Sequence, residues 1–275
     1  MRTEYDSIGE FLKSNARWET SKHTGSSSHR TGEDYFHGTK TYDEALRLIK
    51  RGWQDGAKRV GQMRAELDSA VAATVAAKAV EMRYDVEGDL CDIGRLAIGE
   101  PECCMMYDEQ GPDESKKVVK IIANVCVSGS VSHRVIFARG AAVLAAVDIL
   151  ESLGVRVELI AGFGLSSSYN GGNPCELHVM VKRASEPVET DRLAYVLCHA
   201  SFLRRHGFAA MELAGFDPNC SYPAKVTSND DAIILPELRT GRDPSRSDTI
   251  RQVLDICQKA GIRFDDSEIE ALASK

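Results

Sequence analysis

The sequence predicts an α/β protein with a mostly parallel sheet, helices on both faces, and a mainly helical N-terminal extension. Apolar strand segments and helical segments alternate through the second half of the 275-residue chain. Glycines at positions 154, 207 and 261 follow the three helical segments, where a helix is expected to end. Strands that alternate with helices in this way belong to parallel sheets with covered faces.

The elements of this half follow from the same pattern. Thr190 and Ser247 are the expected N-caps of the second and third helices. A connection rich in glycine, serine and asparagine at residues 162–173 joins two strands, so it lacks the helix N-terminus of a phosphate-binding loop. We expect strands at 118–127, 155–163, 176–181 and 232–235, and helices at 133–153, 191–206 and from 248 to Gly261.

The first part of the chain differs in composition. Residues 1–34 are polar and predict a flexible arm, in which Phe11 and Trp18 are the candidate anchors. Residues 35–110 predict the helical extension, and residues 111–275 the α/β domain.

Within the extension, Thr41 and Glu44 form the pattern of a capping box for a helix that Gly52 closes. A longer helix is expected over residues 56–82, followed by a loop with short strands over residues 85–106.

Charge and cysteine content exclude several classes of protein. The formal net charge of -7 argues against attraction of the whole surface to nucleic acid or anionic membrane. The eight cysteines are dispersed in a long chain and no secretory leader precedes them, which favours a reducing cytoplasm. The longest apolar helical stretch contains Arg139, Asp148 and Glu151, so it predicts a core helix and no membrane span.

One resemblance concerns the α/β domain. Residues 139–154 and the strand after them resemble the first helix and second strand of von Willebrand factor A domains, which are Rossmann-like. Such domains hold a divalent cation through Asp-x-Ser-x-Ser after the first strand, a threonine in a second loop and an aspartate after a later strand. Here Cys126 replaces the first aspartate, Ser128 and Ser130 are retained, and Glu237 follows Pro236 where Thr-Asp-Gly is expected.

This resemblance implies a degenerate metal motif. A thiol is a poor ligand for a hard cation such as Mg²⁺, so we expect no cofactor and keep a divalent cation as the alternative. Another interpretation is that Ser128 and Ser130 cap the turn and the helix that follows.

A second resemblance covers residues 36–53 and 86–103, which are similar to a family of uncharacterised proteins encoded by phages and prophages. It implies a phage origin and a place in the host cytoplasm, with the virion as an alternative. It carries over no catalytic residue.

Cysteine and histidine chemistry has weak support in the pattern. Cys175 and His178 lie three residues apart in a strand, so they face opposite sides. The chain has no Cys-x-x-Cys pair, and adjacent Cys103 and Cys104 leave a zinc site to scattered ligands. The neighbouring Cys198 and His199 are expected inside a helix.

We therefore hypothesise a non-enzymatic, phage-type protein that binds another protein at the carboxyl edge of its sheet, without membrane contact. The first alternative is a nucleic-acid-binding protein of viral transcription, replication or packaging, with Tyr169 or Tyr222 available for stacking. The second alternative is a metal- or cysteine-dependent enzyme. The expected edge residues are Cys126, Ser128, Ser130, Thr190 and Glu237, and the nucleic-acid candidates are Arg204, Arg205, Arg239, Arg242 and Arg246.

Overall fold

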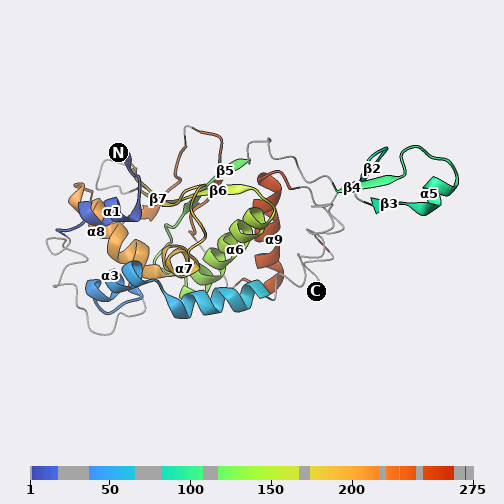
Figure 1. The fold of residues 1–275 in the computed structure, drawn as a ribbon. Helices are drawn as coiled ribbons and strands as arrows, with labels where there is room; N and C mark the ends of the chain where they lie inside the picture. Colours follow the sequence, from blue (N-terminus) through green and yellow to red (C-terminus); the bar gives the residue numbers. More distant parts are fainter. Residues whose placement is uncertain are drawn as a thin grey trace.

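The computed structural model describes residues 2–17, 37–65, 82–88, 90–107, 117–166, 174–216, 218, 221–228, 230–239, 244–262 and 270. Its ribbon contains two sheets, a large one within the main body and a small one formed by residues 82–107 (Figure 1).

The large sheet is mixed, with strand order β1-β7-β6-β5-β9 and β8 paired to β6. Strand β5 lies between β6 and β9 and runs parallel to both, whereas β7 runs antiparallel to β6 and parallel to β1. An antiparallel edge on an otherwise parallel sheet is common in α/β proteins. The strands are β1 (Arg2–Tyr5), β5 (Val118–Asn124), β6 (Arg156–Ser166), β7 (Cys175–Lys182), β8 (Tyr222–Pro223) and β9 (Ala232–Leu235).

Most helices form from the segments that the pattern favours, with some changes of boundary, but those at Ile8–Ser14 and Phe208–Leu213 were not predicted. Residues 54–65 are also helical. The described helices of the main body are α1 (Ile8–Ser14), α3 (Tyr42–Arg51), α6 (His133–Ser152), α7 (Thr190–Cys198), the π-helix η4 (Phe202–Gly207), α8 (Phe208–Leu213) and α9 (Arg246–Lys259).

These helices cover one face of the large sheet. Phe163 of β6 stacks on Phe11 of α1 with ring centroids 6.0 Å apart, and it also packs against Phe202 of η4 at 5.2 Å. Ala123 of β5 lines a small cavity together with α6 and α7 residues. In Figure 1 the helices α6, α7 and α9 lie together below the strands. The core is therefore a single layer between this sheet face and the helices.

The opposite sheet face carries Lys120 and Glu158, and Val118 and Ile234 on it are 54% and 38% exposed. Residues 222–228 cross one end of this face, where the Ala224 carbonyl accepts a hydrogen bond from the Asn124 side chain. Among the described residues, no helix covers it. The prediction of helices on both faces is therefore wrong for this part of the chain.

The N-terminal segment is ordered over its first half. β1 pairs with β7, and Phe11 of α1 is fully buried. The predicted flexible arm over residues 1–34 is thus wrong for residues 2–17, although Phe11 does anchor the segment as expected. Trp18 lies outside the described residues.

Helix boundaries need four corrections. The predicted helix at 191–206 is two elements, because α7 ends at Cys198 and η4 begins at Phe202. Gly207 is the last residue of η4 but does not stop the helical path, since its φ of -62° is helical and α8 follows directly. Thr190 is the first residue of α7 and not its cap, and Ser245 caps α9 in place of Ser247.

Other expectations are confirmed. β9 spans 232–235 and α6 spans 133–152, as the pattern predicts. Thr41 caps α3 by accepting from the Glu44 N–H, while the Glu44 carboxylate accepts from the N–H of Lys40. None of the described helices combines the length and the apolar character that a membrane crossing requires.

The small sheet has strand order β2-β4-β3 and is antiparallel throughout. Its short strands confirm the expectation for residues 85–106, but the short helix was not predicted. Asp92 caps that helix by accepting from the N–H groups of Gly94 and Arg95. The elements are β2 (Met82–Asp85), β3 (Leu90–Cys91), α5 (Ile93–Ala97) and β4 (Cys104–Tyr107).

Candidate binding edge

The carboxyl ends of β5 and β9 lie side by side, and the loops after them form one edge. Pairing continues beyond both strands, because Leu238 donates from its N–H to the Cys126 carbonyl at 3.0 Å. The Ser128 N–H in turn donates to the Leu238 carbonyl at 2.8 Å. The structure therefore brings together four of the five predicted edge positions, namely Cys126, Ser128, Ser130 and Glu237.

The two serines form the exposed part of the edge. Their hydroxyl oxygens lie 3.2 Å apart, and the Ser128 carbonyl accepts from the Val131 N–H in a tight turn. Ser132, and not either of these serines, caps α6 by accepting from the Val135 N–H. The hydroxyls of Ser128 and Ser130 therefore do not cap α6.

Cys126 does not face the edge. Its side chain is fully buried, and burial raises the pKa of the thiol far above its ordinary value. The neutral thiol packs near Gly164 and Cys175, on the core side of the strand. In the described residues, no group of three histidine, cysteine or acidic side chains gathers at this edge. The buried thiol therefore offers no ligand to a hard cation at this edge.

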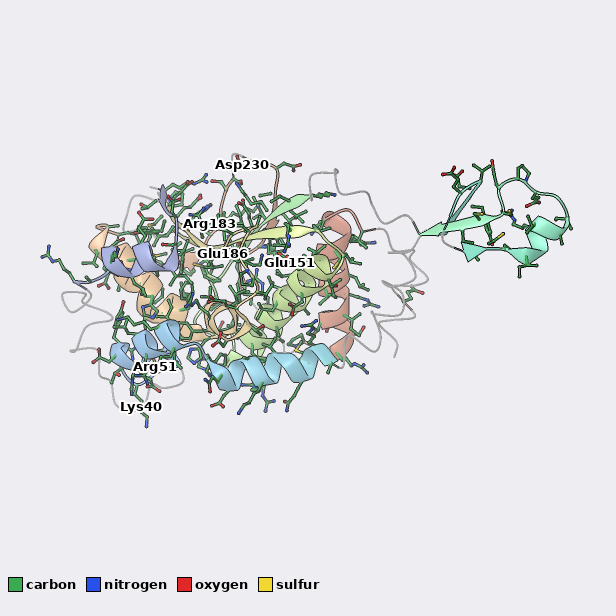
Figure 2. The ribbon with its side chains drawn as sticks, viewed as in Figure 1. Lys40, Arg51, Glu151, Arg183, Glu186 and Asp230 are labelled. Carbon is green, nitrogen blue, oxygen red and sulfur yellow. The ribbon has the colours of Figure 1, made fainter. Side chains whose placement is uncertain are left out.

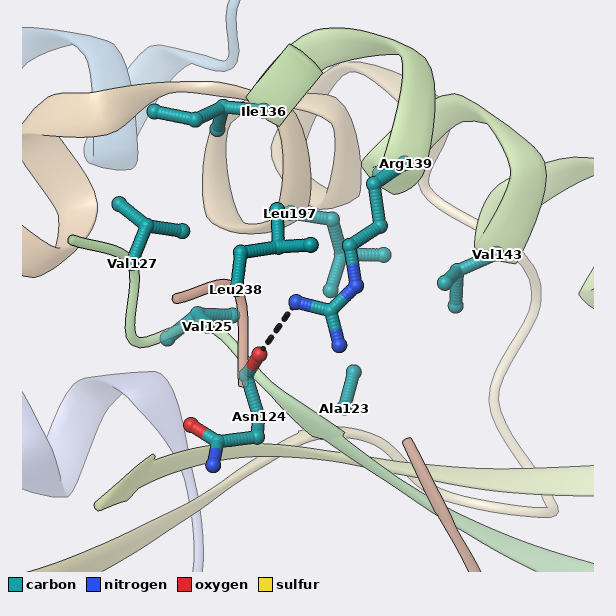
Figure 3. A pocket seen from close by; sticks show the side chains of 10 residues that line it. Ala123, Asn124, Val125, Val127, Ile136, Arg139, Val143, Leu197 and Leu238 are labelled. Atoms are coloured by element: carbon teal, nitrogen blue, oxygen red, sulfur yellow. Dashed lines mark hydrogen bonds between the residues drawn. The ribbon is translucent and has the colours of Figure 1, made fainter. Parts of the chain in front are cut away.

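Arg139 from α6 fills the space between the two strand ends. Its guanidinium donates to the Asn124 carbonyl at 2.8 Å (Figure 3), and it also donates to the Pro236 carbonyl. Burial lowers the pKa of Arg139 to about 10, partly offset by the nearby Glu237 carboxylate. The cavity that remains has a volume of about 20 Å³. That space holds about one water molecule.

Glu237 lies next to this arginine and turns one oxygen inward. Its side chain is only 7% exposed, and Oε1 accepts from Nε of Arg239 at 2.9 Å. Oε2 is buried and has no hydrogen-bond partner within the described structure. Arg239 itself is 64% exposed, so the loop after β9 presents a cation to solvent.

Thr190 lies at the opposite end of the sheet. Because β7 is antiparallel to β6, the chain leaves β7 at Lys182, which pairs with Leu159 near the start of β6. Lys182 donates there to Glu151 at 2.5 Å, at the end of α6. Glu151, Arg183 and Glu186 mark this end in Figure 2. The prediction that Thr190 shares the edge with Ser128 is wrong.

Two of the predicted nucleic-acid residues, Arg204 and Arg205, do not lie on the surface, whereas Arg239 and Arg246 are exposed. Arg204 is 1% exposed and donates to the Ser128 carbonyl at 3.3 Å, so it supports the loop from below. Arg205 is 3% exposed and donates to the Thr39 and Lys40 carbonyls. Both guanidinium groups belong to the interior, which corrects the interpretation of this pair as a solvated phosphate-binding patch. Arg242 lies outside the described residues.

A sequence profile for a domain of unknown function (DUF7192) matches residues 1–263. The chain belongs to the DUF7192 family. Both sheets lie inside the matched range, so the DUF7192 domain includes the small sheet as well as the main body. No curated protein and no solved structure matches the chain.

Two residues of the DUF7192 edge escaped sequence reasoning. Arg139, which bonds to the Asn124 carbonyl, fills the space between the ends of β5 and β9. Neither residue was a predicted site residue. The available signal was Arg139 in the middle of an apolar stretch of the helix, since a charge that faces a core needs partners. The sequence does not show that these partners are carbonyls at the ends of β5 and β9.

Proposed function

We propose that this DUF7192 protein is a non-enzymatic, phage-type binding protein that recognises another protein in the host cytoplasm through the edge formed by Ser128, Ser130, Glu237 and Arg239. The observation that carries the proposal is the closed crevice between β5 and β9. A drug-sized ligand or substrate needs a pocket of roughly 300–1,000 Å³, far above the about 20 Å³ that Arg139 leaves. A surface that lacks a pocket but exposes polar loops suits a macromolecular partner.

The strand order supports placing the interface at this edge. Numbered from β5, the four strands of the α/β domain have the order 3-2-1-4, which is part of the order of doubly wound sheets. In such sheets ligands bind outside the carboxyl ends of the strands, where the order reverses. The reversal lies between β5 and β9. The same order supports the proposal of a degenerate von Willebrand A-like domain.

The chemistry of the edge favours hydrogen bonding over charge attraction. Two serine hydroxyls can donate and accept, and the exposed Arg239 is already paired with Glu237. Burial of Arg204 and Arg205 leaves the edge without a strong positive field. We therefore favour a protein partner over nucleic acid.

The test is an affinity purification of the tagged full-length chain from nuclease-treated lysate of its native host, followed by mass spectrometry. The edge variant combines Ser128→Ala with Ser130→Tyr, which removes one hydroxyl and places a bulky ring on the exposed turn. The matched control combines Glu186→Ala with Thr190→Ala at the opposite end of the sheet.

We expect the control to retain the partner and the edge variant to lose it by at least about tenfold, or 1.4 kcal/mol. Equal retention by both variants contradicts the proposal. The same purification from untreated lysate is the comparison. Partners that are retained there but lost after nuclease treatment, together with recovered nucleic acid, favour the nucleic-acid alternative instead.

A further inference from the structure

Three cysteines gather in the small sheet. The sulfurs of Cys91, Cys103 and Cys104 all lie within 4.8 Å of one another, and those of Cys91 and Cys103 are 3.7 Å apart. In the described part of the chain this is the only group of three or more histidine, cysteine or acidic side chains that converges in this way.

Local structure explains how adjacent cysteines reach the same point. Cys91 pairs with Cys104 across β3 and β4, and directly paired residues share a sheet face. Cys103 precedes β4, so the alternation of strand side chains does not constrain it. Its carbonyl accepts from the Asp92 N–H at 2.8 Å, which holds the two segments together beside the sulfurs.

The spacing matches a tetrahedral thiolate site. A zinc–sulfur bond of about 2.3 Å in a tetrahedron separates neighbouring sulfurs by about 3.8 Å. The observed distance of 3.7 Å between the sulfurs of Cys91 and Cys103 matches this separation. A disulfide requires about 2.05 Å, so these two sulfurs are not bonded to each other.

The apolar side chains whose burial the structure describes in the small sheet are largely exposed. Among its described side chains Cys103 is buried, whereas Ile93, Leu96 and Ile98 are 77%, 56% and 74% exposed. Units of fewer than about 40 residues usually need a metal, disulfides or oligomerisation to fold. The cysteine cluster is the feature of residues 82–107 that meets this need.

We propose that Cys91, Cys103 and Cys104 bind one Zn²⁺ ion that cross-links β3 and β4. Each thiol releases its proton to solvent and binds as a thiolate, as zinc requires. Soft thiolate ligands in a tetrahedral arrangement select zinc over the hard cations. The site does not depend on the function proposed for the large sheet.

In the described part of the chain no further histidine, cysteine or acidic side chain joins the three thiols, so we assign the fourth position to water. The Asp92 carboxylate is engaged, because Oδ1 accepts from the Gly94 and Arg95 N–H groups and Oδ2 accepts from the Tyr84 hydroxyl. Without a metal, the hydrogen bond to Cys103 and the crowding of thiols raise the pKa of Cys91 to about 11. A bound cation reverses this effect, since it stabilises the thiolates.

The experiment measures zinc in the full-length chain purified under reducing conditions. We expect about one zinc per chain, and after exchange with Co²⁺ the visible ligand-field bands and near-ultraviolet thiolate charge transfer of a tetrahedral sulfur site. Cys91→Ser and Cys104→Ser are each expected to weaken zinc binding by at least about tenfold.

Cys257→Ala is the matched control, because that cysteine is buried in α9 of the main body. It should retain the metal and the cobalt spectrum. Circular dichroism confirms that the main body of each variant is folded. The proposal is overturned if the wild-type chain binds no stoichiometric zinc, if both serine variants bind zinc as the wild type does, or if mass spectrometry finds a disulfide among these cysteines under the same conditions.

Discussion

The two sheets of this protein are held together in different ways. In the large sheet, β5, β6 and β7 bury alternate apolar side chains beneath a layer of helices, and aromatic rings such as Phe11 and Phe163 pack within it. In the small sheet the apolar side chains of Ile93 and Ile98 face solvent, and the converging groups are sulfurs. Apolar burial therefore stabilises the first sheet, whereas the zinc site that we propose would stabilise the second.

The largest expected effect of a single substitution comes from the aromatic core. Phe11→Ala removes a fully buried ring that contacts Tyr5, Phe163 and Phe202. We expect the free energy of unfolding, measured by urea denaturation, to fall by about 3–5 kcal/mol.

Ile93→Ala in the small sheet is the comparison for that substitution. Because Ile93 is 77% exposed, we expect a change within about 0.5 kcal/mol. Similar losses for the two variants would show that the small sheet contributes an apolar core of its own.

A smaller effect is expected where α6 and α7 approach each other. A Cβ atom at Gly140 would lie 2.4 Å from the Leu197 carbonyl oxygen, and backbone cannot move aside as a side chain can. Gly140→Ala should lower the free energy of unfolding by about 2–3 kcal/mol.

The control for that change is Gly61→Ala, in the helical residues 54–65. A Cβ atom there meets no atom within 4 Å. Alanine should raise the free energy of unfolding by about 0.5–1 kcal/mol, because it is the better helix former. A loss at Gly61 equal to that at Gly140 would contradict the close approach of the two helices.

Buried histidine makes the main body sensitive to acid. Burial lowers the pKa of His206 to about 4, and nearby Arg205 and His199 act in the same direction. The unfolded chain therefore binds the proton more readily, so stability is lost as pH falls from about 6.5 to about 4. At pH 5 the loss from this one imidazole is on the order of 2 kcal/mol relative to pH 8.

Urea denaturation of the wild type and of His206→Asn at several pH values measures this contribution. The variant should show a shallower dependence on pH between 4 and 6.5. Parallel pH profiles would assign the acid sensitivity to other groups.

Sequence reasoning succeeded where a segment determines its own structure. β9, α6 and the Thr41 cap follow from local apolar pattern and capping chemistry. It failed where the structure of a segment depends on pairing with a strand that is distant in sequence. The four residues of β1 are too few and too polar to be recognised, and their place in the sheet comes from pairing with β7.

The same reason explains the errors at the candidate sites. Thr190 was assigned to the wrong end because the direction of β7 is not evident in its residues. Arg204 and Arg205 resemble a solvated helix end, but η4 turns them into the interior. Cys91 acquires its partners only through the pairing of β3 with β4.

The most direct test of the contrast between the two sheets is hydrogen–deuterium exchange of the full-length chain before and after removal of zinc with a chelator. We predict that amides of residues 90–107 lose protection, beginning with the Asp92 N–H that bonds to Cys103, while β5 and β6 stay protected by their own core. Unchanged protection of residues 90–107 after zinc removal would contradict the account.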